Sequence, residues 1–283
     1  VGAFRGRPEL RVDFMIVGAQ KCGTTTLYSI LDSHPEIQGS RPKETDFFST
    51  TEDWSRELDR YHGYFRPKPG LKYFEASPKY TYYTMRSLCI WDDILRYNPS
   101  TRLIYLVRNP LERVVSGYMH TYERGYIDLD FSTAIRQKRG LVDFTRYYTQ
   151  IIPYVRRFGR DQVLIIDFED LIHRRADVLR SLAGFLDVDP EGFQDVETVK
   201  QNRSIGGPGK RHHKFDNPTL PHRLLRRVAP GLWRRITDNS ARRFAEKPSM
   251  TSEEKRMVLG LLELEIAALE ELMGKDLASW RMV

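Results

Sequence analysis

A segment near the N-terminus combines a glycine-bounded loop with a lysine and a run of hydroxyls. The apolar run Phe14–Val17 leads to Gly18, and the loop that follows contains Lys21 and ends at Gly23. Three threonines then open a segment with helical apolar periodicity. Loop N–H groups and the positive end of a helix dipole both favour a bound anion. The segment therefore predicts a strand, an anion-binding loop and a helix.

The glycine spacing is close to that of a phosphate-binding P-loop, G-x-x-x-x-G-K-[ST]. Gly18 and Gly23 occupy the two glycine positions, but Thr24 stands where that motif has its lysine. The lysine of this loop is Lys21, which would meet the reacting end of a ligand. We interpret the segment as a phosphate-type loop with a displaced cation, and a P-loop-type nucleotide kinase or NTPase stays an alternative.

Further strands are predicted at Lys72–Ser77, Arg102–Val107 and Val163–Asp167, separated by helical patterns. This alternation predicts an α/β fold with a P-loop-like central parallel sheet flanked by helices on both faces. We expect a single domain over residues 1–283, with a core at 12–200. The Gly/Pro-rich basic stretch 202–221 is predicted to be a loop, and a capping box (Thr251, Glu254) begins a C-terminal helix at 251–273.

Polar side chains follow several of these strands, where an open α/β sheet binds its ligands. Arg108 comes directly after Arg102–Val107, Glu75 lies near the end of Lys72–Ser77, and Ser116 lies in the helix after Arg108. A nucleotide triphosphatase would be expected to carry a magnesium-binding carboxylate at the position of Arg108. An arginine and a hydroxyl bind phosphate directly, so the pattern predicts a polyanionic ligand bound without metal.

The positive charge of the chain is concentrated in one stretch. The net charge is +7, and residues 203–236 contain nine lysines and arginines but one acidic residue. A local excess favours an anionic ligand over a nucleic-acid coat. A non-enzymatic polyanion-binding module that uses this stretch is a second alternative.

Composition limits the remaining classes of protein. Two cysteines (Cys22 and Cys89) do not make a disulfide scaffold, which indicates a reducing compartment, and no zinc-ligand spacing is present. No apolar run approaches the roughly 18 residues that span a membrane.

Three motifs, in this order and spacing, resemble the sulfotransferases that use 3′-phosphoadenylyl sulfate (PAPS). They are QKCGTTTL at Gln20–Leu27, KETDFF at Lys43–Phe48 and RNPLERVVSGY at Arg108–Tyr118. The resemblance covers about residues 12–215 and is to the carbohydrate branch, meaning the heparan-sulfate-type O- and N-sulfotransferases and their bacterial relatives. It implies sulfuryl transfer from PAPS to a hydroxyl or amine of a carbohydrate or other small acceptor, with 3′-phosphoadenosine 5′-phosphate (PAP) as product and no metal.

The resemblance also implies roles for individual residues. Lys21 would act on the leaving phosphate, and Arg108 and Ser116 would bind the 3′-phosphate. A loose match at 209–211 corresponds to the segment that covers the cofactor. The implied cofactor-binding residues are Lys21, Cys22, Gly23, Thr24, Thr25, Thr26, Arg108, Ser116, Gly209, Lys210 and Arg211.

On the acceptor side, Glu44 matches the family's catalytic glutamate, and His120 matches a histidine that assists in the N-sulfotransferase branch. Lys43, Asp46 and Glu75 are the candidate acceptor contacts. The 3-O-sulfotransferase branch has Glu-Lys-x-Pro where this chain has Glu75-Ala76-Ser77-Pro78, and histidine where it has Asp46. Both differences argue against heparan sulfate itself as the acceptor.

The bacterial relatives favour a cytoplasmic location, and the Golgi lumen is the alternative if the sequence is a catalytic domain cut from a longer protein. We expect no nucleic-acid partner. Of the tyrosines and phenylalanines near these loops, most are expected to belong to the core.

Overall fold

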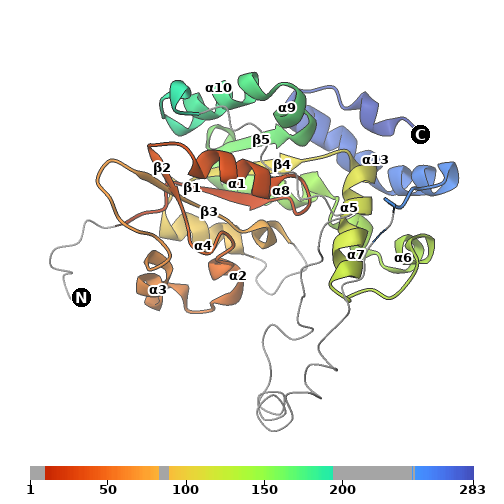
Figure 1. The fold of residues 1–283 in the computed structure, drawn as a ribbon, viewed down its shortest axis with the longest axis horizontal. Coiled ribbons are helices and arrows are strands. Elements are labelled where there is room, and N and C mark those ends of the chain that lie inside the picture. Colours follow the sequence, from red (N-terminus) through yellow and green to blue (C-terminus); the bar gives the residue numbers. More distant parts are fainter. Residues whose placement is uncertain (1–9, 83–88, 194–243, 245) are drawn as a thin grey trace, which may run out of the picture. The chain divides into compact units, whose positions relative to one another are not determined.

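The computed structural model describes residues 10–82, 89–193, 244 and 246–283 (Figure 1). The chain divides into two compact units. The first comprises residues 1–109, 144–199 and 261–282, and the second comprises residues 110–143, 200–260 and 283. The sheet and its flanking helices belong to the first unit. The predicted loop at 202–221 lies outside the described residues, and the prediction of one domain over 1–283 stays a prediction.

A five-stranded parallel sheet forms the centre of the first unit, in the order β2-β3-β1-β4-β5. The central strand β1 pairs with β3 (Phe14 opposite Phe74) and with β4 (Ile16 opposite Ile104). Its five residues are all buried, as expected for a strand covered on both faces. The strands are β1 (Phe14–Gly18), β2 (Ile37–Gly39), β3 (Lys72–Ala76), β4 (Arg102–Val107) and β5 (Val163–Asp167).

The order of the strands places helices on both faces. The connection from β1 through α1 (Thr24–Asp32) to β2 runs one way across the sheet. The connections through α4 (Ile90–Tyr97) and α8 (Tyr147–Phe158) run the other way. Right-handed crossovers then put α1 on one face and α4 and α8 on the other, which Figure 1 shows for α1 and α4. The predicted α/β class with a parallel, two-sided sheet is confirmed.

The direction of the connections reverses between β1 and β4, which are neighbours in the sheet. At such a reversal the loops that leave the two strands diverge, and a crevice opens at their carboxyl ends. The loop Ala19–Gly23 follows β1 and Arg108 follows β4. The sheet therefore directs both predicted anion-binding elements to its switch point.

Several predicted helices are more interrupted than their patterns indicated. Residues 131–157, whose sequence pattern predicts helix in two pieces, form three helices, α6 (Phe131–Gln137), α7 (Gly140–Asp143) and α8. The helix expected over 171–186 is also divided, into α9 (Phe168–His173) and α10 (Arg175–Leu186). The remaining helices of the described residues are α2 (Phe47–Thr50), α3 (Leu58–His62), α5 (Pro110–Glu123) and α13 (Ser252–Met273), with 3₁₀ turns at Trp54–Arg56, Pro78–Thr81, Arg160–Gln162, Pro190–Gly192 and Ala278–Arg281.

The C-terminal helix matches its prediction closely. Thr251 and Glu254 form the reciprocal capping box: the backbone N–H of Glu254 donates to Thr251 Oγ1 (3.2 Å), and that of Thr251 donates to Glu254 Oε2 (2.9 Å). Gly274, which follows the helix, has a positive φ of 61°. Both ends thus have the conformations that their residue types favour.

The second unit contains α5, α6, α7 and the first part of α13. Within it, the Arg113 side chain is almost fully buried and donates from Nη1 to the carbonyl of Leu141 (2.8 Å). Tyr118 packs against Phe131, with ring centroids 4.9 Å apart. These contacts hold α5 to α6 and α7.

Candidate active site

The loop between β1 and α1 has a backbone that requires glycine. Gly23 is the residue before α1 and has φ 90°, in the left-handed region. A Cβ at this position would lie 2.3 Å from Cδ2 of Phe168. Any other residue would therefore be strained both by its own backbone and by its neighbour. Lys21 also has a positive φ, 68°, so the loop is tightly curled.

The start of α1 offers donors for an anion. Gly23 makes no side-chain cap, and within the described part of the chain no partner accepts from the backbone N–H groups of Thr24, Thr25 and Thr26. Such N–H groups at a helix N-terminus bind phosphate-type anions. The hydroxyls of Thr25 and Thr26 lie on exposed or half-buried side chains of the same turn. The donor set therefore fits the charged oxygens of a nucleotide.

Arg108 and the same loop both lie against one aromatic ring, that of Phe168. Its guanidinium carbon is 5.0 Å from the centroid of the Phe168 ring, and the same ring contacts Gly23. Phe168 begins α9 directly after β5. The ends of β1, β4 and β5 thus meet around Phe168, which connects the loop to Arg108. Phe168 was not among the predicted site residues, although its place after the predicted strand Val163–Asp167 could have indicated it.

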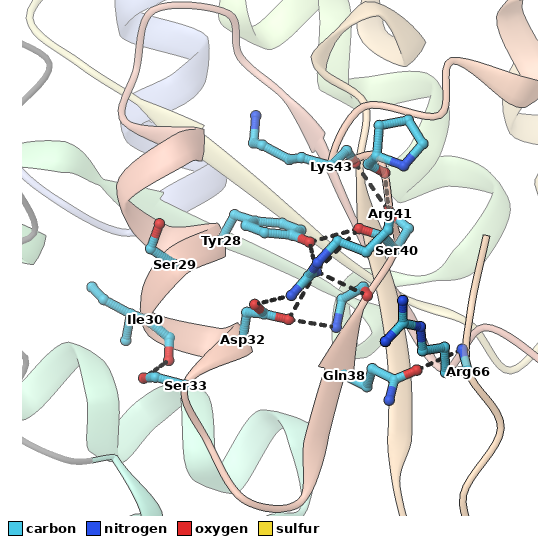
Figure 2. A network of polar contacts seen from close by, with 12 residues as sticks. Tyr28, Ser29, Ile30, Asp32, Ser33, Gln38, Ser40, Arg41, Lys43 and Arg66 are labelled. Carbon is cyan, nitrogen blue, oxygen red and sulfur yellow. Dashed lines mark hydrogen bonds and ion pairs between the residues drawn. The ribbon is translucent and has the colours of Figure 1, made fainter.

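A polar network connects α1 to the loop that carries Glu44 (Figure 2). The Asp32 carboxylate pairs with Arg41 (Nη2 to Oδ2, 2.6 Å) and accepts from the backbone N–H of Gly39 (2.9 Å). Tyr28 accepts from Arg41 Nη1 and donates to the carbonyl of Ser40 (2.7 Å). Burial and the neighbouring Asp32 raise the pKa of Tyr28 to about 12, so Tyr28 stays a donor at neutral pH. The helix that starts at the anion loop therefore also holds the chain before Glu44.

Glu44 lies in the loop that follows β2, and its side chain is 48% exposed. Its carboxylate pairs with Lys43 (2.9 Å). Asp46, two residues on, has φ 51° and pairs through Oδ2 with Lys79, while its Oδ1 is buried without a partner. Lys79 was missed by the sequence analysis because only the fold brings it to Asp46. The loop therefore presents two carboxylates, each beside one lysine.

Glu75 occupies a different environment from the exposed Glu44. It is fully buried, and its oxygens accept hydrogen bonds from Thr45, Tyr61, Ser77 and Tyr80. Burial raises the pKa of Glu75, and the four hydroxyl donors partly offset this by stabilising the charged form. The predicted contact of Glu75 with an acceptor stays a prediction, and the burial of the side chain argues against it.

The aromatic residues around this loop belong largely to the core, as expected. Tyr61, Tyr80, Phe65 and Tyr82 are all at most 8% exposed. The Tyr61 ring stacks on Phe47 with centroids 4.5 Å apart. Burial raises the pKa of Tyr61 and of Tyr80 well above the ordinary value. The stacked Tyr61 ring thereby supports the segment that follows Glu44.

The remaining predicted site residues lie in the second unit, outside the described residues or buried within the anion loop. Ser116 and His120 lie on α5 in the second unit, and both are half-buried. Gly209, Lys210 and Arg211 lie outside the described residues. Cys22 is buried in the anion loop, with its Sγ 3.4 Å from the hydroxyl of Tyr147. The roles predicted for all of them stay predictions.

The first unit thus has the features of a nucleotide-type anion-binding α/β protein, with donors at a sheet switch point and carboxylates on the adjacent loop. A family model described as "Sulfotransferase domain" matches residues 11–219. The chain belongs to this family, as its three motifs predicted.

Curated relatives of the carbohydrate branch are similar to this chain. The human bifunctional heparan sulfate N-deacetylase/N-sulfotransferase 2 is 26% identical over 196 residues, covering 62% of this chain and 22% of the relative. The mouse heparan sulfate glucosamine 3-O-sulfotransferase 3B1 is 27% identical over 242 residues, covering 76% of this chain and 58% of the relative. The chain therefore spans less than a quarter of the first relative and little more than half of the second.

Among solved structures, a sulfotransferase from Alicyclobacillus acidocaldarius has the same fold, with a TM-score of 0.69 at 23% identity. The match covers 96% of this chain and all of the other. Within the residues described here, no helix is long and apolar enough to cross a membrane, and no three His, Cys, Asp or Glu side chains are grouped to hold a metal ion.

Proposed function

We propose that this chain is a PAPS-dependent sulfotransferase that acts on a hydroxyl or amine of a carbohydrate or other small acceptor. One observation carries the proposal: the curled loop at Lys21–Gly23 and Arg108 lie at the switch point of the sheet, joined by Phe168. Membership of the sulfotransferase family supports the reaction class. Its similarity to heparan sulfate enzymes of both the N- and O-type supports a carbohydrate as acceptor class.

The donor set fits the proposed nucleotide. PAPS, when bound, supplies the sulfuryl group that is transferred. The N–H groups of Thr24–Thr26 and the Lys21 ammonium are donors suited to its 5′-phosphosulfate, and Arg108 is suited to a phosphate dianion. Lys21 can stabilise charge on the leaving phosphate oxygen by a charge-assisted hydrogen bond. Sulfuryl transfer, like phosphoryl transfer, depends mainly on such positioning and charge stabilisation.

Glu44 is the proposed general base. An alcohol is a weak nucleophile until its proton is taken, and a positioned carboxylate can accept that proton as the new bond to sulfur forms. The Glu44 carboxylate is about half exposed, so an acceptor can reach it. Lys43 forms an ion pair with this carboxylate.

The proposal is tested by transfer of radiolabelled sulfate from PAPS. The acceptor panel contains an N-unsubstituted heparosan oligosaccharide, a neutral oligosaccharide and a simple phenol, with products identified by mass spectrometry. We expect one class to be sulfated and Glu44→Gln to lower turnover about 10²- to 10⁴-fold. Glu57→Gln is the matched control, because Glu57 is also exposed and paired with a basic residue, Arg60, yet lies on another segment, directly before α3. No transfer to any acceptor, or equal effects of the two variants, would contradict the proposal.

A further inference from the structure

A buried carboxylate lies directly beneath the loop of the proposed base. Glu75 is 0% exposed and lies near the end of β3. Its Oε1 accepts from the hydroxyls of Tyr61 (2.6 Å) and Tyr80 (2.9 Å). Its Oε2 accepts from Ser77 Oγ (2.7 Å) and from Thr45 Oγ1. Four donors match the roughly four lone-pair positions of a carboxylate, which is an acceptor only.

Three of these four hydroxyls also accept a backbone N–H from consecutive residues of one segment. Ser77 Oγ accepts from the N–H of Asp46 (3.0 Å). Thr45 Oγ1 accepts from the N–H of Phe47 (3.2 Å). The Tyr80 hydroxyl accepts from the N–H of Phe48 (3.3 Å). Each of these three hydroxyls therefore donates its proton to the Glu75 carboxylate and accepts a backbone N–H of residues 46–48 on its oxygen. We call this arrangement the hydroxyl relay.

These N–H groups lie at the start of α2. The first backbone N–H groups of a helix have no carbonyl acceptor within the helix itself. Asp46 precedes that helix, and its side chain makes no cap bond because it pairs with Lys79. The segment 46–48 therefore lacks the usual side-chain cap. The hydroxyl relay from Glu75 replaces it.

The relay depends on the direction of the hydroxyl protons. Because a carboxylate cannot donate, every hydroxyl proton points toward Glu75, and every hydroxyl oxygen keeps its lone pairs for the backbone. An amide at the same place would donate from its nitrogen and force the facing hydroxyls to turn. A turned hydroxyl would no longer hold its lone pairs in their present direction toward the backbone N–H, and that hydrogen bond would be weakened.

We propose that Glu75 is a positioning residue, which fixes the base Glu44 by ordering the flanking Thr45 and residues 46–48 through this hydroxyl relay. Glu44 is adjacent to Thr45 and is bracketed on its other side by Lys43, whose carbonyl accepts from the N–H of Ala76 (3.3 Å). The backbone is thus fixed on both sides of Glu44 while its carboxylate stays exposed to an acceptor. This inference rests on the proposed function for its catalytic consequence, but the relay itself does not.

The first readout is amide hydrogen exchange in the full chain, resolved to residues 46–48. Glu75→Gln keeps the shape of the side chain but replaces one acceptor oxygen of the carboxylate by an N–H₂ donor. Thr45→Val and Ser77→Ala each remove one hydroxyl of the relay. We expect exchange at these amides to rise about five- to tenfold, the scale of one lost hydrogen bond. Tyr61→Phe is the matched control: it removes a donor to Glu75 Oε1, but Tyr61 accepts no N–H of this segment.

The second readout is turnover with PAPS and the best acceptor of the panel. A displaced base lowers kcat about 10- to 100-fold, because small displacements of reacting groups are costly, while KM for PAPS stays unchanged. Tyr61→Phe lowers stability but leaves kcat and the exchange of residues 46–48 unchanged. The relay is overturned if Tyr61→Phe reproduces the exchange changes or if Thr45→Val and Ser77→Ala lack them. The positioning role is overturned if exchange rises but kcat does not fall. A wild-type chain that transfers no sulfate contradicts the proposed function and leaves the exchange result to decide the relay.

Discussion

Replacement of Gly23 by alanine tests the structure of the anion loop most severely. The residue has φ 90°, and an added Cβ would lie 2.3 Å from Cδ2 and 2.4 Å from Cε2 of Phe168. The left-handed backbone costs a non-glycine residue about 1–2 kcal/mol. Forcing an extra methyl group against a packed ring costs about 1–3 kcal/mol more. We therefore expect Gly23→Ala to lower the free energy of unfolding by about 2–5 kcal/mol.

Gly70 provides the matched control for the backbone contribution. Its φ is 78°, and a Cβ there would meet nothing within 4 Å. Gly70→Ala should therefore cost about 1–2 kcal/mol, from the left-handed conformation alone. The two variants and the wild type are compared by urea unfolding. The difference between the variants, about 1–3 kcal/mol, measures the contact of the loop with Phe168.

The affinity of the same two variants for PAP distinguishes an effect on the geometry of the anion loop from an effect on stability alone. Phe168 also lies under Arg108, so a methyl group at Gly23 that displaces the ring disturbs both predicted anion-binding elements. Gly23→Ala should weaken PAP binding at a temperature where the variant is folded, and Gly70→Ala should not. Equal unfolding free energies for the two variants, together with unchanged PAP affinity, would refute the reasoning about this loop.

Three further outcomes follow from the structure. Arg108→Ala should weaken PAP binding by about 1.5–3 kcal/mol, the scale of a charged hydrogen bond, in a calorimetric titration; an unchanged affinity contradicts its role. Burial raises the pKa of Glu75 in the native state above its ordinary value of 4.5. At pH values between the unfolded-state pKa and this raised native-state pKa, the native state therefore binds more protons than the unfolded state. The free energy of unfolding should therefore fall as pH rises through that window, and Glu75→Gln should remove this fall in urea unfolding at a series of pH values; parallel curves contradict it. Turnover should be unchanged by EDTA, and a loss restored by magnesium would favour a kinase or NTPase.

The anion loop was predictable from sequence because its determinants are local. The strand Phe14–Gly18, the glycine at 23 and the apolar periodicity of Thr24–Asp32 all lie within one short stretch. The parallel sheet followed from the alternation of strands and helices for the same reason. The pattern over 131–157 indicated helix in two pieces, and the division into three helices was not predicted because a helical pattern does not show where tertiary contacts break it.

The surroundings of Glu44 could not be predicted because they come from distant parts of the chain. The sequence showed Glu75 only as a polar residue near a strand end. Its four donors span residues 45 to 80, and nothing in the local pattern showed that they converge on a buried carboxylate. The acceptor contact of Glu75 stays a prediction, and the internal network around its carboxylate could not be read from the sequence. The pairing of Asp46 with Lys79 was hidden for the same reason.

The central claim is that the loop at Lys21–Thr26 and Arg108 form a site for PAPS. The most direct test is calorimetric titration of the chain with PAP in EDTA, beside ATP and AMP under the same conditions. The account predicts micromolar binding of PAP, no comparable binding of ATP or AMP, and loss of PAP affinity in Arg108→Ala. Tight binding of ATP that requires magnesium, with no response to PAP, would contradict it.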